Sequence, residues 1–411
     1  MHILHVIASA DLKDGGPIEH AVRTGRALAL RGHRQDLLTF DHPAALCAEE
    51  LDARVFAFAG RPRSGWLGKF ASAALDIPRA LNWMRKHLTD YDMVVVSGLW
   101  NVATLTARLG LPGGRTPYIL FTHGMLDPYF KRANPLKSLI KQLLWLVNER
   151  VLVRRADRVL FTCEEERRLA RQSYRPYTAH ERVVAFGTAD APPPSEAQTA
   201  AFAAHVPDLG GRPFLLFLSR IHEKKGVDLL IRGYAALLRA ESDTGFDLVI
   251  AGPDSNGLRG RMEALAGLEG VERRIHWPGM LKGDAKWGAF RSCDAFILPS
   301  HQENFGIVVA EAMACSRPVL ISDKVNIWRE VADDGAGIVE TDSVEGVEAL
   351  LRRWTSLNDD QRSAMETAAR TAFLRRYDMD SAVEDLERIM LETIRERDVP
   401  TDKIKMEVVA H

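Results

Sequence analysis

Short apolar runs alternate with amphipathic helical segments along almost the whole chain, and this alternation limits the fold more than any other feature. Clear examples are HILHVIA (2–8), MVVVSG (93–98), YILFTHG (118–124), FLLFLS (214–219) and DLVIAG (247–252). Strands that are apolar throughout are typical of parallel sheets covered by helices on both faces. The sequence therefore predicts an α/β protein built from doubly wound parallel sheets.

A proline-rich stretch, APPPSEAQ (191–198), divides this pattern into two parts and has the composition of a linker. The length of 411 residues also suggests two domains. We expect a Rossmann-like N-terminal domain over 1–190, a Rossmann-like C-terminal domain over 199–375, and a mostly helical, charged remainder over 376–411. The two domains would face a cleft at the carboxyl ends of their strands, where such sheets bind ligands.

The composition excludes several other classes of protein. A net charge of −1 argues against nucleic acid as the main partner, because phosphate binding usually leaves a basic excess. The four cysteines are scattered, with no CxxC pair and no nearby His cluster, so we expect reduced thiols and no metal site. No apolar run approaches the ~20 residues needed to cross a bilayer, and the start does not resemble a signal peptide. We therefore expect a cytoplasmic protein.

In the N-terminal half, three features near strand ends are candidates for the cleft. Gly15 and Gly16 follow the first strand and would let the phosphate or sugar of the donor approach the backbone closely, although a tight turn explains them equally well. His123 ends the strand at 118–124, where cleft residues collect, although a single His there can also be structural. Asp127 lies close by in sequence and is a second candidate, which we assign to the acceptor side.

The C-terminal half carries basic residues suited to a diphosphate. In LSRIHEKKGVDLLI (218–231), Arg220 leaves a strand and Lys225 precedes Gly226, which opens a helix. A guanidinium binds phosphate oxygens as a fork, and an ammonium binds them as a point charge. We favour phosphate binding for Arg220 with Lys225, and a solvated surface position for Lys224.

The stretch HQENFGIVVAEAMAC (301–315) places Glu303 on a strand-to-helix turn and Glu311 about one turn into the helix. Either glutamate alone could simply complement the helix dipole. Two carboxylates beside a diphosphate would be repelled unless each held neutral hydroxyls, so the pair indicates a sugar-containing ligand. The N–H groups at the helix start would bind the diphosphate, and they belong to Asn304, Phe305, Gly306 and Ile307.

Residues 131–158 form a basic amphipathic stretch in which only Glu149 and Asp157 are acidic, and Trp145 lies among its apolar residues. Such a helix can lie on an anionic membrane surface. A core-packed helix with a solvated basic rim is an equally good interpretation. The basic residues are Lys131, Arg132, Lys137, Lys141, Arg150, Arg154, Arg155 and Arg158.

Together these motifs resemble the retaining, nucleotide-sugar-dependent glycosyltransferase family four, whose members have two Rossmann-like domains (the GT-B fold). Within that family the chain is similar to bacterial enzymes of exopolysaccharide or O-antigen biosynthesis. The E-x7-E and R…KKG stretches are specific, and the N-terminal motifs are weaker. The resemblance rests on Gly15-Gly16, THG (122–124), Arg220 with Lys225-Gly226, AGPD (251–254), WPGML (277–281) and Glu303-x7-Glu311.

The resemblance implies roles for the site residues. The diphosphate of the donor would lie against Arg220, Lys225 and the backbone of 304–307, without a metal ion. Glu311 would hold the ribose, and Glu303 would contact the transferred sugar. No second carboxylate stands as an obvious nucleophile, unlike the pair in retaining glycosidases. A short-lived oxocarbenium ion attacked on the same face therefore fits best.

The resemblance also implies that His123 lies at the reacting sugar, that Met280 and Leu281 meet the nucleobase, and that a last helix over 376–395 crosses back to the N-terminal domain. The chain departs from the family at AFGTADAP (185–192), where many members have Pro-Asn-Gly-Val-Asp. This departure leaves the contacts between the domains open.

The predicted function is therefore a retaining hexosyltransferase that needs no cofactor beyond its nucleotide-sugar substrate. Its acceptor would be a glycan, such as a lipid-linked polysaccharide repeat unit at the inner membrane face. One alternative is a nucleotide-sugar 2-epimerase of the same fold, but its expected cluster of acid/base carboxylates is not evident. The other is a non-catalytic nucleotide-sugar-binding protein, which the intact Arg220, Lys225, Glu303 and Glu311 argue against.

Overall fold

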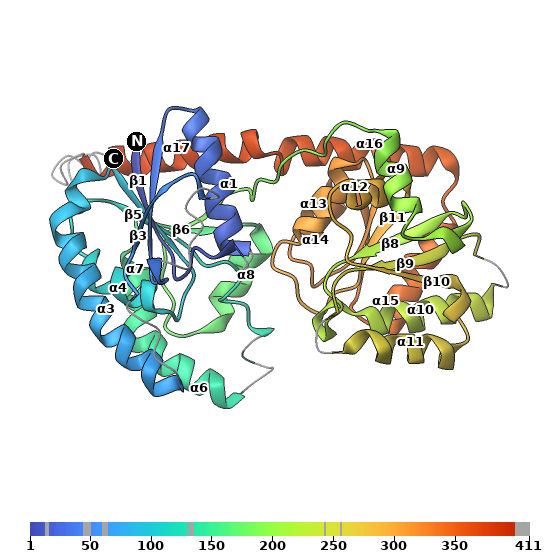
Figure 1. Ribbon diagram of the computed structural model, residues 1–411, viewed down its shortest axis with the longest axis horizontal. Helices are drawn as coiled ribbons and strands as arrows, with labels where there is room; N and C mark the ends of the chain where they lie inside the picture. Colours follow the sequence, from blue (N-terminus) through green and yellow to red (C-terminus); the bar gives the residue numbers. More distant parts are fainter. Residues whose placement is uncertain are drawn as a thin grey trace, which may run out of the picture. The chain divides into compact units, whose positions relative to one another are not determined.

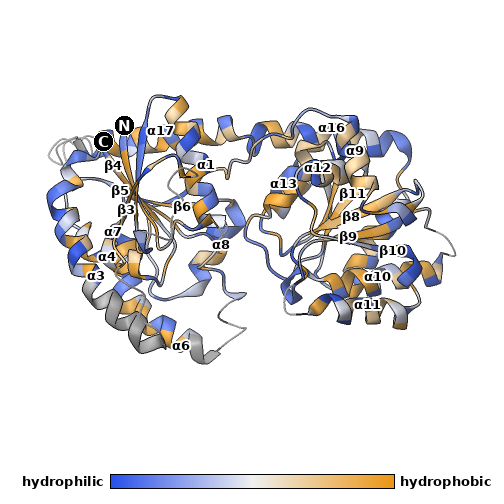
Figure 2. Ribbon diagram, viewed as in Figure 1, coloured by the Kyte–Doolittle hydropathy of each residue, from blue (hydrophilic) through white to orange (hydrophobic). Residues whose placement is uncertain are grey.

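The computed structural model describes residues 1–12, 16–43, 51–59, 65–129, 131, 135–241, 244–254 and 257–398. The chain forms two compact units. The first unit combines Met1–Phe186 with Ala382–His411, and the second unit is Gly187–Ser381. Figure 1 shows the elements of both units, and Figure 2 shows that the strands at the centre of each unit are its most hydrophobic part.

The first unit contains a seven-stranded sheet in the order β3-β2-β1-β4-β5-β6-β7, with every pair of neighbours parallel. The strands are β1 (His2–Val6), β2 (Arg34–Thr39), β3 (Arg54–Ala57), β4 (Met93–Ser97), β5 (Tyr118–Phe121), β6 (Arg158–Phe161) and β7 (Glu181–Val183). The helices are α1 (Gly16–Leu30), α3 (Gly65–His87), α4 (Val102–Gly110), α6 (Pro135–Leu144), the π-helical turn η4 (Trp145–Glu149), α7 (Arg150–Arg155), α8 (Glu164–Ser173) and most of α17 (Met379–Asp398).

The second unit contains a six-stranded parallel sheet in the order β10-β9-β8-β11-β12-β13. The strands are β8 (Phe214–Leu218), β9 (Asp247–Ala251), β10 (Ile275–Gly279), β11 (Ala295–Leu298), β12 (Val319–Ser322) and β13 (Gly337–Glu340). The helices are α9 (Glu196–Ala203), α10 (Val227–Ala240), α11 (Leu258–Glu269), α12 (Gly283–Ser292), α13 (Ile307–Ala314), α14 (Trp328–Asp333), α15 (Val344–Thr355) and α16 (Asp359–Arg376). Two doubly wound parallel sheets confirm the predicted fold class.

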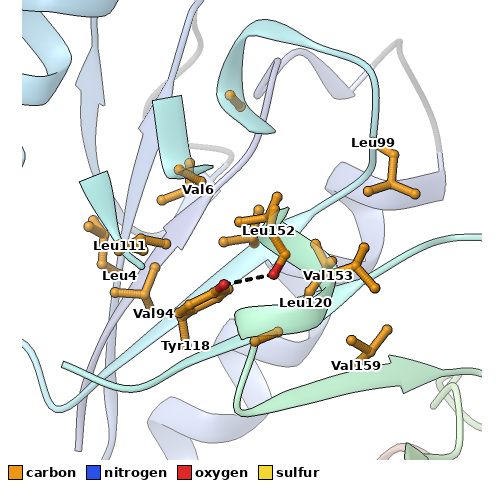
Figure 3. Close-up of a cluster of buried hydrophobic side chains, with 14 of the residues drawn as sticks. Leu4, Val6, Val94, Leu99, Leu111, Tyr118, Leu120, Leu152, Val153 and Val159 are labelled. Atoms are coloured by element: carbon orange, nitrogen blue, oxygen red, sulfur yellow. Dashed lines mark hydrogen bonds between the residues drawn. The ribbon is translucent and has the colours of Figure 1, made fainter. Parts of the chain in front are cut away.

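Alternate residues of the first sheet face different helical layers, because side chains along a strand alternate between its two faces. Leu4, Val94 and Leu120 lie in a buried cluster with Leu152 of α7 (Figure 3). In the same cluster the hydroxyl of Tyr118 donates to the carbonyl of Leu152 at 2.7 Å, so the polar end of a buried ring is satisfied. The odd-numbered residues of β1 face the other way, toward the side of the sheet covered by α1.

Helix α17 packs on the first unit through both apolar and ionic contacts. Leu386, Ile389 and Met390 are buried, and Glu387 accepts from both Arg31 (Nε, 2.5 Å) and His33 (Nε2, 2.7 Å). Two further ion pairs toward its end join Arg158 to Glu396 (2.5 Å) and Arg397 to Asp157 (2.8 Å). The last helix thus joins segments that are distant in the sequence.

The chain enters and leaves the second unit along one path. Thr188 forms a parallel bridge with Asp378, and its N–H donates to the carbonyl of Tyr377 at 2.8 Å. The two oxygens of Asp190 accept from Arg370 at 2.5 and 2.7 Å. The divergent stretch 185–192 is therefore anchored to the end of α16.

Two local features differ from the sequence analysis. Strand β3 was not predicted, because it is a short edge strand whose residues are only half buried. The stretch 191–198 is only partly a linker, since Ser195 caps α9 by accepting from the N–H of Gln198, and the helix begins at Glu196. None of the described helices is long and apolar enough to cross a membrane.

Candidate functional site

In the second unit, the loops after β8 and β11 approach each other very closely. Lys225 ends a 3-10 turn (η6, Glu223–Lys225), and Gly226 follows with φ of +67°. A Cβ atom at Gly226 would lie 2.1 Å from the carbonyl oxygen of Pro299, so only glycine fits here. The N–H of His301 also donates to the carbonyl of Lys224 at 2.8 Å. The backbone of one loop therefore fixes the other.

This approach brings two of the predicted site residues together. The ammonium of Lys225 directly contacts the carboxylate of Glu303, and both side chains are largely buried. Each charge compensates the other. A phosphate would compete with Glu303 for Lys225, and a hydroxyl could take the carboxylate contact that Lys225 gives up.

Glu303 itself is held through its backbone. Its N–H donates to the carbonyl of Lys324, and its carbonyl accepts from Asn326, both at 3.0 Å. Gly306 precedes α13 with φ of +76°, and a Cβ there would lie 3.2 Å from Cγ of Glu303. Ile307 is the first residue of the helix, as predicted, so the helix begins beside the Glu303 side chain. Its free N–H groups make this end attractive to an anion.

Glu311 is buried in α13, and its Oε1 accepts from Nζ of Lys286 at 2.6 Å. Lys286 comes from α12 and was missed by the sequence analysis. Nothing in its sequence surroundings distinguishes it from a surface lysine, because its position depends on two helices meeting. One oxygen of Glu311 is therefore bound by a cation, and the other oxygen can accept a hydrogen bond from a hydroxyl.

The remaining residues that were predicted to bind the sugar donor differ in the exposure of their side chains. Arg220 follows β8 and is exposed, without a contact to Glu303 among the described contacts. Met280 is 52% exposed, whereas Leu281 is buried, so only the Met280 side chain is accessible to a base. Phe305 is buried with its ring against Tyr377, which leaves its backbone to contact a ligand.

In the first unit, His123 follows β5 with φ of +48°, an uncommon value for a residue other than glycine. Its Nε2 lies 3.0 Å from Oγ of Ser97, which in turn lies 2.8 Å from Nε2 of His5. Burial lowers the pKa of His123 to about 3 and that of His5 to about 4. Both rings are therefore neutral near pH 7. Ser97 and His5 were missed by the sequence analysis, because adjacent strands bring them to His123.

Two of the other predicted residues of the first unit, Gly16 and Asp127, lie in the described part of the chain. Gly15 lies outside the described residues, and Gly16 is the exposed first residue of α1. Asp127 is buried, and its Oδ1 accepts from the N–H of Tyr129 at 2.8 Å, which stabilises a local turn. Over the described part of the chain, no group of three or more His, Cys, Asp or Glu side chains could hold a metal ion. Chemistry without a metal stays a prediction.

Comparisons with known proteins match both units of the chain to glycosyltransferases. Residues 15–187 match the family model of the glycosyl transferase 4-like domain, and residues 203–372 match that of glycosyl transferases group 1. A D-inositol 3-phosphate glycosyltransferase from Nocardia farcinica is 29% identical over 204 residues, which is 47% of this chain and 43% of that relative. The alignment thus spans less than half of the relative's length.

Solved structures agree over nearly the whole chain at low sequence identity. A glycosyltransferase from Rickettsia africae has a TM-score of 0.74 at 13% identity, and the alignment covers 96% of this chain and 98% of the Rickettsia chain. HepE from Anabaena, solved in complex with UDP, has a TM-score of 0.73 at 17% identity and covers 95% of this chain and 100% of its own. These structures show the GT-B fold. With two family models matching successive units, the chain belongs to the group 1 glycosyltransferases, of the GT-B, family-four type.

Proposed function

We propose that this protein is a retaining, metal-independent hexosyltransferase that moves a hexose from a nucleoside-diphosphate sugar to a glycan acceptor, in the assembly of an exopolysaccharide or O-antigen repeat unit. The observation that carries the proposal is the contact between Lys225 and Glu303 beside the start of α13. It joins a cation for phosphate to a carboxylate for sugar hydroxyls. The UDP named for HepE supports a nucleotide ligand.

In the proposed reaction, the bond between the anomeric carbon and the diphosphate breaks, and the acceptor oxygen bonds to that carbon on the same face of the sugar. The proton of the acceptor hydroxyl passes to the leaving diphosphate oxygen. Lys225, Arg220 and the N–H groups at the start of α13 stabilise the charge of the leaving diphosphate. Donors fixed in advance act without reorganisation, and losing one typically costs about 2.7–4 kcal/mol of barrier. Glu303 orients the sugar through its hydroxyls.

Lys225→Ala tests this role, with Lys224→Ala as the matched control on the neighbouring residue. We expect kcat of Lys225→Ala to fall by roughly 100- to 1000-fold, the scale set by one preorganised donor, whereas Lys224→Ala stays near the parent. Turnover would be followed as nucleotide release from UDP-, GDP- and ADP-sugars, with and without a glycan acceptor and with chelator present. Rates of Lys225→Ala within threefold of the parent would contradict the role.

The same assay separates the alternative functions. A transferase releases the nucleoside diphosphate in proportion to added acceptor, whereas a 2-epimerase alters or releases its sugar without one. A non-catalytic binding protein would give a thermal shift with one nucleotide class and no turnover with any acceptor.

We further propose that an exposed apolar face on α6 and η4 rests on an anionic lipid surface, which would bring the protein to a lipid-linked acceptor. Trp145 is fully buried, so it packs in the core and does not insert into a membrane. Around it, large apolar side chains are between 42% and 65% exposed. They are Leu139, Ile140, Leu143, Leu144, Leu146 and Val147.

The charges around this face match an anionic partner. Lys131, Arg154 and Arg155 are exposed, whereas the two acidic residues of the stretch are taken up inside the unit. Glu149 is buried and accepts from the N–H of Trp100 at 3.0 Å, and Asp157 pairs with Arg397 in α17. Arg132 lies outside the described residues, as does the side chain of Lys137. An apolar face with a basic border fits a membrane surface with acidic headgroups.

Co-sedimentation with vesicles of phosphatidylglycerol and phosphatidylcholine tests this surface. Leu139→Ser/Leu143→Ser/Val147→Ser should lose most of the binding to anionic vesicles, whereas Leu30→Ser/Leu268→Ser, at positions 90% and 86% exposed elsewhere, should not. Light scattering without lipid provides the second measurement. If the triple variant instead abolishes a dimer and leaves vesicle binding unchanged, the face joins two copies of the chain and the membrane proposal is wrong.

A further inference from the structure

We propose that a chain of hydrogen bonds through Gln35, His5 and Ser97 fixes the tautomer of His123, so that its Nδ1 is presented as an acceptor for a substrate hydroxyl. The first three are then positioning residues for His123. The reaction that uses the hydroxyl rests on the proposed function, whereas the tautomer is a property of the protein alone.

The four side chains lie together because of the register of the sheet. Ile3 pairs with Gln35 on β2, and His5 pairs with Val95 on β4. Side chains two residues apart share a face of a strand, so Gln35, His5 and Ser97 all lie on the α1 side of the sheet. His123 follows β5, the next strand, and reaches back to Ser97.

This chain of hydrogen bonds begins at a backbone carbonyl, which can only accept a hydrogen bond. The carbonyl of Ala21 in α1 accepts from Nε2 of Gln35 at 3.0 Å, which orients the side-chain amide. Oε1 of Gln35 then faces Nδ1 of His5 at 3.4 Å, and because this oxygen is an acceptor, His5 Nδ1 carries the proton. A neutral imidazole has one N–H, so Nε2 of His5 is left as an acceptor.

The positions of the remaining protons follow from counting the hydrogen-bond donors. Ser97 has one O–H, and it donates to Nε2 of His5 at 2.8 Å. The oxygen of Ser97 can then only accept from His123, so the proton of His123 is on Nε2, 3.0 Å away. Nδ1 of His123 therefore carries a lone pair, and no described residue forms a hydrogen bond to it. His123 is partly exposed, at the strand end where ligands of such sheets bind.

A glycine on α1 makes room for the first link. A Cβ at Gly25 would lie 2.5 Å from Nε2 of Gln35, closer than any real contact allows. Gly25→Ala would therefore push the amide away from Ala21 without touching His5, Ser97 or His123. This substitution therefore disturbs the chain of hydrogen bonds at Gln35, the end farthest from His123.

The expected chemistry of His123 is specific. A neutral ring with its lone pair outward accepts a hydrogen bond from a sugar or acceptor hydroxyl, and it has no proton to give at that position. His123 then orients or weakly activates a hydroxyl and does not act as a general acid. His123→Asn could keep an acceptor oxygen nearby, whereas His123→Ala cannot.

The experiment uses the full chain with 15N-labelled histidine and two-bond 15N–1H spectra, assigned with single variants of His5, His20 and His123. In the parent, Nδ1 of His123 should appear unprotonated and Nε2 protonated. In Ser97→Ala, Gln35→Leu and Gly25→Ala the two tautomers should mix. Thr106→Ala serves as a matched control, because Thr106 is a buried hydroxyl of the same unit that bonds the carbonyl of Val102.

Kinetics provide the second readout. We expect about a tenfold rise in KM for one substrate in Ser97→Ala and Gln35→Leu, with a smaller change in kcat and no change in Thr106→Ala. A protonated Nδ1 in the parent, or an unchanged tautomer in Ser97→Ala, would overturn the proposal. Correct tautomers in a protein that transfers no sugar would leave the hydrogen-bond series standing and contradict the proposed function instead.

Discussion

Glu311 and Lys286 form a largely buried ion pair, and its partners depend on each other. Removing one member of such a pair leaves the other charge without compensation in a poorly solvated place. Because the lysine is partly exposed, we expect Lys286→Met to lower the free energy of unfolding by about 1–3 kcal/mol, below the range for fully buried pairs.

A double-mutant cycle measures this dependence by chemical denaturation. The variant Lys286→Met/Glu311→Met should be more stable than Lys286→Met alone, because no charge remains unpaired. If Lys286→Met and the double variant are equally stable, the pair contributes nothing and the contact is a surface feature.

His20 is a second buried ionisable residue, stacked on Phe186 with ring centroids 4.3 Å apart. Burial, helped by nearby His123, holds the pKa of His20 well below its usual value of 6.5. The unfolded chain then binds the proton more readily than the folded protein does. The contribution of neutral His20 to the free energy of unfolding is therefore fully present above about pH 6.5 and declines as the pH falls. The decline is up to about 1.4 kcal/mol per pH unit for each such group.

Thermal melts between pH 5 and 7.5 check this prediction. His20→Phe keeps an aromatic ring against Phe186 and should reduce the loss of Tm at low pH. His205→Gln, at an exposed position, should melt with the pH dependence of the parent. Parallel curves for all three proteins would show that His20 does not titrate on unfolding.

At the scale of elements, the apolar contacts of α17 should outweigh its ion pairs. Ile389 is buried, and truncating such a side chain typically costs about 2–5 kcal/mol. Glu387 pairs with Arg31 and His33 near the surface, where an ion pair contributes about 1 kcal/mol or less. We therefore expect Ile389→Ala to loosen the helix far more than Glu387→Gln does.

Hydrogen exchange in α17 measures the difference directly. Amides of Met379–Asp398 should exchange much faster in Ile389→Ala and nearly at the parent rate in Glu387→Gln. The reverse order would mean that charge, and not burial, holds the helix on the first unit.

The strands and most helices could be predicted from the sequence because their patterns are local. An apolar run or a helical period can be recognised within a short stretch of sequence. The strands of both sheets lie at such apolar runs. Strand β3 was not predicted, because a short, half-buried edge strand shows neither an apolar run nor a helical period. The start of α9 at Glu196 escaped because the prolines before it dominate the composition.

The candidate site could be predicted only in part, for a related reason. Glu303, Glu311 and Lys225 stand in recognisable motifs, and the structure brings Lys225 to Glu303. Lys286 and Ser97 have no motif, since their importance arises when a second helix or strand lies beside them. Leu281 stands in a motif, but the motif did not indicate that its side chain is buried.

At the scale of the whole molecule, the residues that we propose to bind the diphosphate and the ribose all lie within the second unit. They are Arg220, Lys225, the backbone of 304–307 and Glu311. The nucleoside diphosphate of the sugar donor, added alone, should therefore slow hydrogen exchange in the loops after β8 and β11, over 218–226 and 299–311. Peptides of the first unit, such as 93–98 and 118–124, should be protected only when an acceptor is added. Equal protection of both units by the nucleoside diphosphate alone would contradict a diphosphate site confined to the second unit.

The first unit is discontinuous, since it is completed by residues from Ala382 onward. During translation the ribosome therefore releases Met1–Phe186 well before the segment that pairs with Arg31, His33 and Arg158 exists. At about 5–20 residues per second, synthesis of the intervening unit delays this segment by roughly 10–40 s. The second unit can finish folding first, although its sequence comes later, and the nascent first unit leaves the docking surface of α17 uncovered for that interval.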